Sequence, residues 1–276
     1  MTLRFAYNTN GAANHRLDDA IDLIADAGYD GVAITLDIHH LDPFAEGWVQ
    51  ETERVSSRLQ RLGLASVIET GARFLLDPKA KHEPTLVTAD ASARLRRIGF
   101  LKRAIDIAAI LRSEAVSFWA GVPKAGVDSA DAMGWLRDGV ADVVAYADAQ
   151  GVVPCLEPEP GMLIETLDDF ARLDIEGLRL ALDTGHCLVT QEREPAAAIA
   201  EFAERIGTVA IEDMARGVHV HLPFGEGDMD VGGVLTALES ISFGKLICVE
   251  LSRESHRADV MIPQALAYLR EARRHA

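Results

Sequence analysis

The sequence predicts a (β/α)8 barrel, an α/β fold in which eight parallel strands alternate with helices. Short apolar runs alternate with longer amphipathic runs along the whole chain, and eight such pairs can be counted over its 276 residues. The turn after the first apolar run, Asn8-Thr9-Asn10-Gly11, lacks the Gly-rich pattern of a doubly wound dinucleotide-binding sheet. No linker or low-complexity segment divides the chain, so we expect residues 1–276 to form one domain.

Each element is placed by its apolar pattern, in chain order. The first helix has apolar residues at three- and four-residue spacing and ends before Gly28, and Thr166 is expected to cap a short helix. We expect strands at residues 3–7, 31–35, 65–68, 115–119, 152–156, 178–182, 208–211 and 246–249. We expect the intervening helices at 17–27, 55–64, 91–111, 132–149, 166–173, 195–205, 231–240 and 259–273.

Charge and cysteine content exclude several classes of protein. The formal net charge of −16 would repel nucleic acid and an anionic membrane surface, and no basic cluster offsets it. No apolar run reaches the 18 residues of a membrane span, and the N-terminus does not resemble a signal peptide. Three cysteines in apolar runs indicate reduced core residues, so we expect a cytoplasmic protein. Barrels of this size often form dimers or tetramers, and the sequence leaves a homo-oligomer open.

Acidic residues end several of the expected strands. Glu69, Glu157, Asp183, Glu212 and Glu250 follow strands three, five, six, seven and eight. A barrel brings the carboxyl ends of its strands to one mouth, where five carboxylates would repel one another unless some were protonated or a cation lay between them. Together with nearby histidines, they predict a divalent ion such as Mn, Mg, Co or Zn. A single strand-end acid is more often a helix cap or a loop residue, and the loop pair His39-His40 is expected to face solvent.

Three motifs in order resemble the xylose-isomerase-like TIM barrels, which include sugar isomerases and epimerases and are related to the family-2 apurinic endonucleases. They are Leu182-Asp183-Thr184-Gly185-His186, Gly225-Glu226-Gly227-Asp228 and Val249-Glu250. The resemblance covers nearly the whole chain. It implies a metal site made by a Glu, an Asp, a His and a Glu on strands five to eight, and the first, second and fourth fall on Glu157, Asp183 and Glu250.

The strand-seven ligand departs from the family pattern. The family histidine lies three residues before an Asp, and this position is Ala210 here. Glu212 shares the inward face of that strand and is favoured as the replacement. Alternatively, His219 or His221 from the following loop would supply the ligand, with His219 preferred.

The resemblance implies proton transfer next to a carbonyl of an open-chain sugar or polyol, with a metal ion as Lewis acid for the enediolate. Glu157 and Glu250 would be the acid–base pair, and His186, Arg253, Glu69 and His221 would bind substrate. Arg73, Lys81 and His82 are further candidates, and Trp119 would form an apolar wall or pack in the core. Only four cationic residues are expected near the mouth, which favours an uncharged sugar or inositol derivative; they are Arg73, Lys81, Arg216 and Arg253.

Two other classes of function remain open at this point. One is a metal-dependent lyase or hydrolase on a keto-sugar or glycoside, which would begin with the same proton abstraction; nucleic-acid repair is disfavoured by the net charge. The other is a non-catalytic barrel that binds a small ligand. This hypothesis stays open because Ala210 stands where the family has a histidine.

Overall fold

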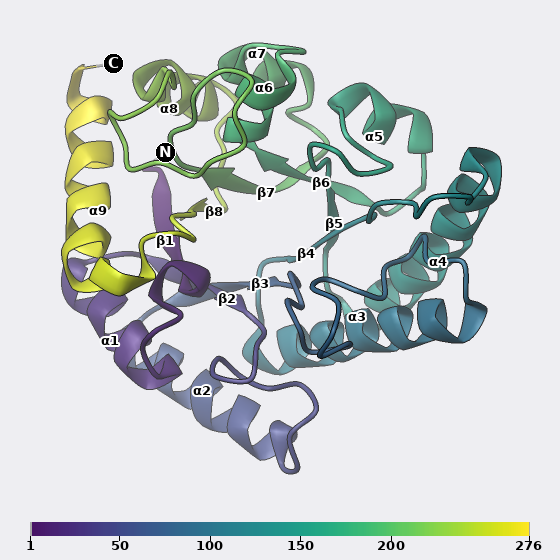
Figure 1. Ribbon diagram of the computed structural model, residues 1–276. Helices are drawn as coiled ribbons and strands as arrows, with labels where there is room; N and C mark the ends of the chain where they lie inside the picture. The colour runs from purple at the N-terminus through teal and green to yellow at the C-terminus, as the bar shows by residue number, and fades with distance from the viewer. Residues whose placement is uncertain (1, 276) are drawn as a thin grey trace.

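Eight parallel strands form a closed barrel in sequence order, surrounded by helices (Figure 1). The structure is a computed structural model that describes residues 2–275. The strands are β1 (Arg4–Asn8), β2 (Gly31–Thr35), β3 (Ala65–Glu69), β4 (Val116–Trp119), β5 (Pro154–Glu157), β6 (Arg179–Asp183), β7 (Ile206–Ile211) and β8 (Leu246–Val249). Pairing of β1 with β8 closes the barrel, so the predicted (β/α)8 fold is confirmed.

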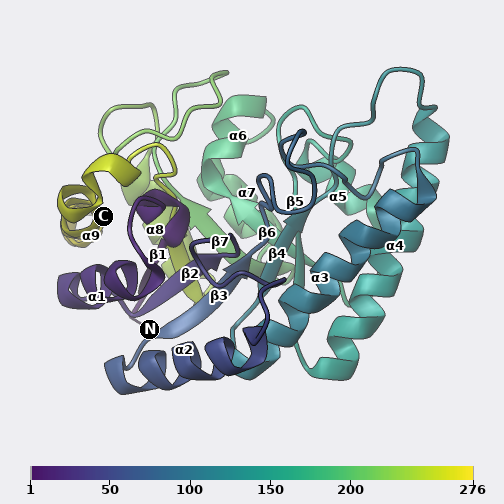
Figure 2. The ribbon, with the colours of Figure 1, turned by 60° about the horizontal axis from the view of Figure 1, so that its bottom comes forward.

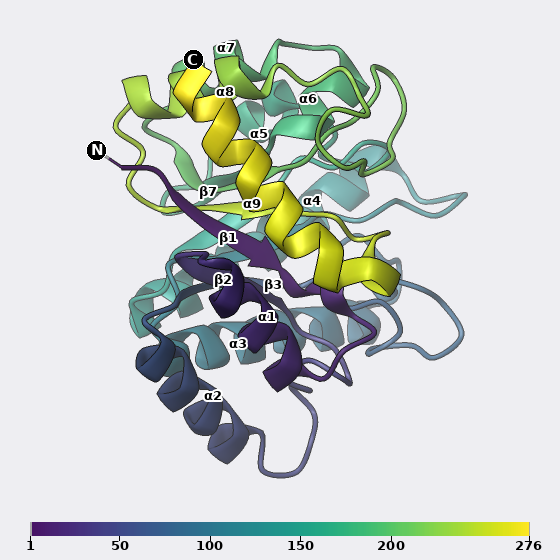
Figure 3. The same ribbon diagram turned by 90° about the vertical axis from the view of Figure 1, so that its left-hand side faces the viewer.

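The helices follow the strands and pack on the outside of the barrel, as Figure 2 shows for α1 to α4. The α-helices are α1 (Leu17–Ala27), α2 (Trp48–Leu62), α3 (Ala91–Leu111), α4 (Ser129–Gln150), α5 (Leu167–Leu173), α6 (Thr184–Thr190), α7 (Pro195–Glu201), α8 (Val231–Ser240) and α9 (Ala258–His275). Two short 3-10 helices, η1 (Thr9–Ala12) and η2 (Ser255–Arg257), lie in the loops after β1 and β8. The last helix, α9, lies across the outside of β1 and packs between α1 and α8 (Figure 3).

Local sequence signals account for most helix ends. Asp90 and Asp128 accept hydrogen bonds from the first backbone amides of α3 and α4, and Thr166 forms a capping box with Asp169 at α5. Gly28 ends α1 in the left-handed conformation that a residue without a Cβ adopts at little cost. The sequence missed α6, because a helix of seven residues directly after a strand leaves too short a periodic pattern to detect.

The barrel has a core on each side of its sheet. Large apolar side chains fill the layer between the strands and the helices, whereas small ones such as Ala6, Ala33, Val67 and Ala181 fill the barrel interior. All three cysteines are buried and free, as expected. No helix among residues 2–275 is long and apolar enough to cross a membrane. Because the apolar interior stops below the strand ends, polar side chains occupy the mouth.

Candidate active site

A cavity of about 700 Å³ opens at the carboxyl ends of the strands. Asn8, Thr35, Glu69, Trp119, Glu157 and Asp183, the last residues of β1 to β6, all line it. Glu250, which follows β8, lines it as well. The expected gathering of Glu157, Asp183 and Glu250 around one cavity is therefore what the structure shows.

Asp183 has two separate tasks. Its Oδ1 accepts hydrogen bonds from the backbone amides of Gly185 (2.8 Å) and His186 (3.1 Å), so it caps α6. Its Oδ2 is buried and has no hydrogen-bond partner among the described residues. A buried carboxylate oxygen without a donor is costly, and the nearest groups that can place a positive charge or a proton at this atom are the His186 imidazole, whose Nε2 is 3.4 Å away, and the Glu212 carboxyl group.

Glu212 lies fully buried behind the cavity wall and does not line the cavity. When ionised, its two carboxylate oxygens have no hydrogen-bond donor, whereas the protonated side chain forms a hydrogen bond with Asp183. Oε2 is 4.0 Å from Nδ1 of His221. A Cβ at Gly185 would come within 2.1 Å of Glu212 Oε1, so the glycine makes room for this carboxylate. Ala210 pairs with Asp183 across β6 and β7, and no imidazole extends from this position.

Amide and hydroxyl groups orient Glu250 and the side chains that end β1 and β2. Asn10 Nδ2 donates a hydrogen bond to Glu250 Oε1 at 2.7 Å. Asn8 Oδ1 accepts from the Thr35 hydroxyl at 2.6 Å, which fixes the side chains that end β1 and β2. Glu250 is therefore oriented by a neutral donor rather than by a cation.

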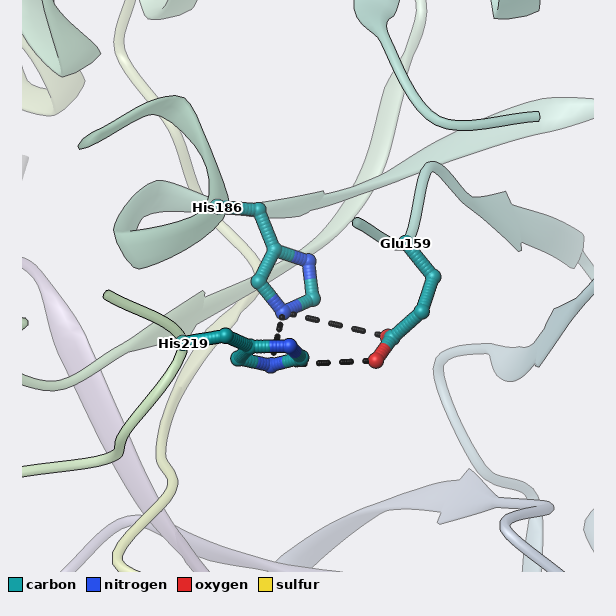
Figure 4. Close-up of side chains that lie close together, drawn as sticks. All are labelled: Glu159, His186 and His219. Carbon is teal, nitrogen blue, oxygen red and sulfur yellow. Dashed lines mark hydrogen bonds and ion pairs between the residues drawn. The ribbon is translucent and has the colours of Figure 1, made fainter. Parts of the chain in front are cut away.

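Three side chains from different segments, Glu159, His186 and His219, lie close together (Figure 4). Nε2 of His186 is 3.2 Å from Nε2 of His219 and 3.8 Å from Glu159 Oε2. Glu159 Oε1 is 3.7 Å from His219 Nε2. His186 is buried in α6, whereas His219 and Glu159 come from the loops after β7 and β5. Within residues 2–275, two sets of side chains have ligand atoms close enough to hold a metal ion: Glu157, Asp183 and His186, and Glu159, His186 and His219.

Burial and crowding shift the protonation equilibria of this cluster. Burial raises the pKa of Glu157 and of Glu212, and neighbouring carboxylates raise both further. Burial opposes the charge of Asp183, but His186 and His221 hold its pKa below the usual value. Burial also opposes the charge of His186, yet Asp183 and Glu159 raise its pKa, whereas burial and His186 lower the pKa of His219 to about 4.

Glu69 is the one carboxylate on the opposite side of the mouth. It accepts a hydrogen bond from the Ser117 hydroxyl, and burial together with Glu250 raises its pKa to about 8. Glu69 therefore favours its protonated form when the site holds no cation, and in that form it is a hydrogen-bond donor.

The loop after β3 brings two cationic side chains and an imidazole to the same wall. Arg73, Lys81 and His82 line the cavity, and Arg73 Nη1 lies 3.5 Å from Asp37 Oδ2. Burial lowers the pKa of His82, so its ring favours the neutral form. Trp119 lines the cavity and is largely buried, which is compatible with both of its expected roles. Behind it, the buried guanidinium of Arg97 stacks at 4.2 Å from the indole centroid.

The remaining predicted residues divide between the mouth and the surface. Arg253 and His221 line the cavity, whereas Arg216 is exposed and pairs with Glu194. The expectation that His39 and His40 face solvent is wrong for His40, which is buried with Nε2 2.9 Å from the His15 carbonyl oxygen. A turn hydrogen bond with Asp37 folds this loop inward, which the sequence pattern did not indicate.

Sequence reasoning did not connect Glu159 with the two histidines. Glu159 lies two residues after Glu157, and this spacing was the available signal. The loop after β5, closed by a hydrogen bond from Glu159 N to Ile164 O, carries the Glu159 side chain toward α6. Loop geometry of this kind does not follow from residue spacing.

Comparisons with known proteins agree with this architecture. The family model described as "Xylose isomerase-like TIM barrel" matches residues 21–272. No curated protein matches the chain. Among solved structures, an L-ribulose 3-epimerase superposes with a TM-score of 0.78 at 20% identity, covering 99% of this chain and 97% of that one.

Two further solved structures are similar. A 3-keto-D-glucoside 4-epimerase from E. coli has a TM-score of 0.74 at 17% identity and covers 98% of this chain and 100% of its own. The IOLI protein, described with a binding zinc atom, has a TM-score of 0.74 at 16% identity and covers 98% and 97%. At these identities the likeness shows the fold.

Proposed function

The chain belongs to the xylose isomerase-like TIM barrel family, and from that premise we propose that it is a metal-dependent isomerase or epimerase of a sugar or polyol. The observation that carries the proposal is that Glu157, Asp183 and Glu250, from three different strands or strand ends, line one cavity. A barrel that only bound a sugar would have no need to crowd carboxylates whose burial raises their pKa values, such as Glu157.

The residues present fit a divalent cation. When both side chains are ionised, Asp183 Oδ2 and the oxygens of Glu212 are buried without a hydrogen-bond donor, and carboxylates with imidazoles are ligands for Mn, Mg, Co or Zn. We assign Glu157, Asp183 and Glu250 as ligands, with Glu212 in the place of the histidine that Ala210 lacks. When bound, such an ion supplies Lewis-acid chemistry to a carbonyl compound.

Glu157 and Glu250 are the proposed acid–base pair. Asn10 occupies Oε1 of Glu250, which leaves Oε2 as the atom that takes or returns a proton. Glu157 ends β5 and faces the cavity from another part of the barrel, so the two carboxylates approach a bound substrate from different directions. One removes the proton next to the carbonyl, and the other delivers it to the neighbouring carbon or to the opposite face.

Other cavity residues position the substrate. We assign His186, His221, Arg253 and Glu69 to its hydroxyl or carbonyl oxygens, because each lines the cavity and carries a hydrogen-bonding group. Sugar epimerases among the similar structures support a small sugar as substrate. The buried free cysteines support a reducing compartment, and we place the protein in the cytoplasm.

Exchange of substrate hydrogen with solvent tests the chemistry directly. The protein is incubated with open-chain ketoses and inosose-type polyol ketones in D2O with Mn²⁺, and NMR follows deuterium entering the carbon next to the carbonyl. We expect exchange that stops on chelation and in Glu157→Gln, while Glu176→Gln, on the surface far from the mouth, retains it. Exchange that survives both chelation and Glu157→Gln would contradict the proposal.

The same spectra separate the alternative reactions. An isomer or epimer of the substrate supports the proposed function, whereas an unsaturated product would identify a lyase that shares the first proton abstraction. Absence of exchange with every ketone tested, in protein shown to hold a divalent ion, would favour a barrel that only binds its ligand.

A further inference from the structure

The loop after β3 folds back on itself and carries two positive charges to one wall of the cavity. His82 N donates a hydrogen bond to the carbonyl oxygen of Arg73 at 2.6 Å, and His82 Nδ1 is 2.6 Å from the carbonyl oxygen of Gly71. These contacts join the two ends of the turn, so the backbone of Lys81, the residue before His82, lies close to that of Arg73. Arg73, Lys81 and His82 all line the cavity.

The chain leaves both of these charges available to a ligand. Among residues 2–275, Lys81 forms no ion pair, and the ion pair of Arg73 is a single contact of 3.5 Å with Asp37. In the same part of the chain, no carboxylate that lines the cavity pairs with either side chain. The exposed Lys81 alone would be satisfied by water, but a third positive charge nearby is out of the reach of water.

That third charge is Arg97 of α3, which is only 1% exposed. Its Nε and Nη1 have no hydrogen-bond partner, and no carboxylate of residues 2–275 forms an ion pair with it. Burial lowers the pKa of Arg97 to about 9, which the charge of Glu83 only partly offsets. Glu83 Oε1 already pairs with Lys124 at 2.6 Å, and its Oε2 accepts a hydrogen bond from the Thr88 hydroxyl at 3.0 Å. A buried charge without a counter-charge is costly, so an anion bound nearby would stabilise Arg97.

The three charges act on the same part of the wall. The Arg97 guanidinium stacks 4.2 Å from the centroid of the Trp119 indole, and the His82 ring packs edge-on against the same indole at 5.4 Å. Trp119 and His82 both line the cavity, so Arg97 lies one side chain behind it. Burial lowers the pKa of His82, and the charges of Lys81, Arg97 and Arg73 lower it further. All three residues therefore contribute positive potential at this wall.

We propose that the substrate carries an anionic group, a carboxylate or a phosphate, away from its reacting carbonyl, and that Arg73 and Lys81 bind this group. The buried charge of Arg97 strengthens the attraction from behind the wall, where a low dielectric screens it little. Guanidinium and ammonium groups recognise both anions through charge-assisted hydrogen bonds. This assignment rests on the proposed function, because Glu157 and Glu250 define the reacting end of the substrate and would repel its anionic end.

The uncharged substrate expected from the sequence was based on the number of cations near the mouth rather than on their placement. Arg216, which that expectation included, is exposed and pairs with Glu194, whereas Arg97 was not included and lies behind the cavity wall. Cations remain few, but three of them act at one place. Such a wall suits one anionic group at one end of a small sugar.

Calorimetry of ligand binding tests the wall without any measurement of turnover. D-Fructose, D-tagatose and D-allulose are each compared with the counterparts that carry a carboxylate or a phosphate at C6, in protein loaded with Mn²⁺ and freed of excess metal. We expect at least one charged sugar to bind more than about tenfold more tightly than its neutral parent, as for a hydrogen-bonded charge. The preference should shrink at high salt. The charged form that binds more tightly identifies the anionic group.

Variants of the β3 loop locate the preference. Lys81→Gln and Arg73→Gln are each expected to reduce the ratio of charged to neutral affinity by about three- to tenfold. Arg97→Met should reduce the ratio by about two- to fivefold, since its charge acts without contact. Lys79→Gln, at an exposed position of the same loop outside the cavity, is expected to leave the ratio unchanged. Because each ratio compares two ligands on one variant, a general change in folding or in the Trp119 wall cancels.

Three results would overturn the anionic substrate. They are charged sugars that bind no more tightly than their neutral parents, a preference that survives in both Lys81→Gln and Arg73→Gln, and a preference that is lost instead in Arg253→Gln, the cation in the loop after β8. Solvent exchange on neutral ketoses without any charge preference would contradict this inference alone. A charge preference without exchange on any ketone would contradict the proposed function alone.

Discussion

The two halves of the mouth differ in chemistry. The half built by β5 to β8 carries most of the carboxylates and imidazoles, with the single cation Arg253, whereas the half built by β1 to β4 carries amides, hydroxyls and, in the β3 loop, Arg73, Lys81 and His82. The β5–β8 side, called the first half below, includes Glu157, Asp183 and His186. The β1–β4 side, called the second half, includes Asn10, Thr35 and Lys81. The difference indicates a division of labour in which one side holds ions and moves protons while the other binds and orients the substrate.

Removing an acid from the first half should have the largest effect. We expect Glu157→Gln or Glu250→Gln to lower kcat by about 10³-fold, within the range for loss of a general acid or base. Steady-state kinetics of the isomerisation measure it, with melting temperature as the control for folding. A kcat within tenfold of the unmodified protein would show that the division between the halves is wrong.

Side-chain packing behind the first half is also expected to tolerate little added volume. Gly185→Ala places a Cβ against Glu212 Oε1 and the Met214 side chain, so we expect destabilisation of about 1–3 kcal/mol in urea unfolding. Gly134→Ala, in α4 with nothing near its Cβ, is the matched control and should gain about 0.5–1 kcal/mol. Equal stability of the two variants would mean that Glu212 has room to move.

Glu69 is the exception in the second half, and pH tests it. Its folded pKa of about 8 is above the unfolded value, so its contribution to stability is complete below about pH 4.5 and is lost as pH rises through 8. We expect the metal-free protein to lose up to about 1.4 kcal/mol per pH unit over this window from Glu69, and Glu69→Gln to remove that slope. Chemical unfolding at several pH values measures it. An identical pH slope in the variant would place the titration elsewhere.

The cationic side chains of the second half should give the smallest effect. Lys81→Gln is expected to raise KM about two- to fivefold for a neutral sugar with kcat unchanged, because uniform binding alone is lost. Lys79→Gln, in the same loop but outside the cavity, serves as the control. A much larger rise for sugars that carry a carboxylate or phosphate would sharpen the comparison, since it would assign this wall to an anionic group.

The residue pattern predicted which strand-end carboxylates line the cavity, but it missed the cluster of Glu159, His186 and His219. The strand-end carboxylates Glu157 and Asp183 were placed correctly because strand register fixes where a barrel strand ends and which way its side chains point. Glu212 follows the same strand alternation, but its side chain lies in the space beside Gly185, behind the wall of the cavity. Its assignment as a ligand remains a prediction.

Loops account for what the sequence did not predict. Glu159 and His219 approach His186 from segments outside the strands, and His40 turns inward through a hydrogen bond to a backbone carbonyl. Such contacts depend on turn conformations and long-range packing, which spacing along the chain does not encode. Helix α6 was overlooked for a related reason, because its start coincides with the end of β6.

Because Asp183 both caps α6 and lines the cavity, this carboxylate connects the cavity directly to the backbone of that helix. One oxygen holds the amide hydrogens of Gly185 and His186, and the other points to the space where ligands bind. Anything that immobilises the second oxygen should therefore slow exchange of those two amide hydrogens with solvent. Binding at the mouth could then be measured as slower amide hydrogen exchange in the first turn of α6, without any turnover of substrate.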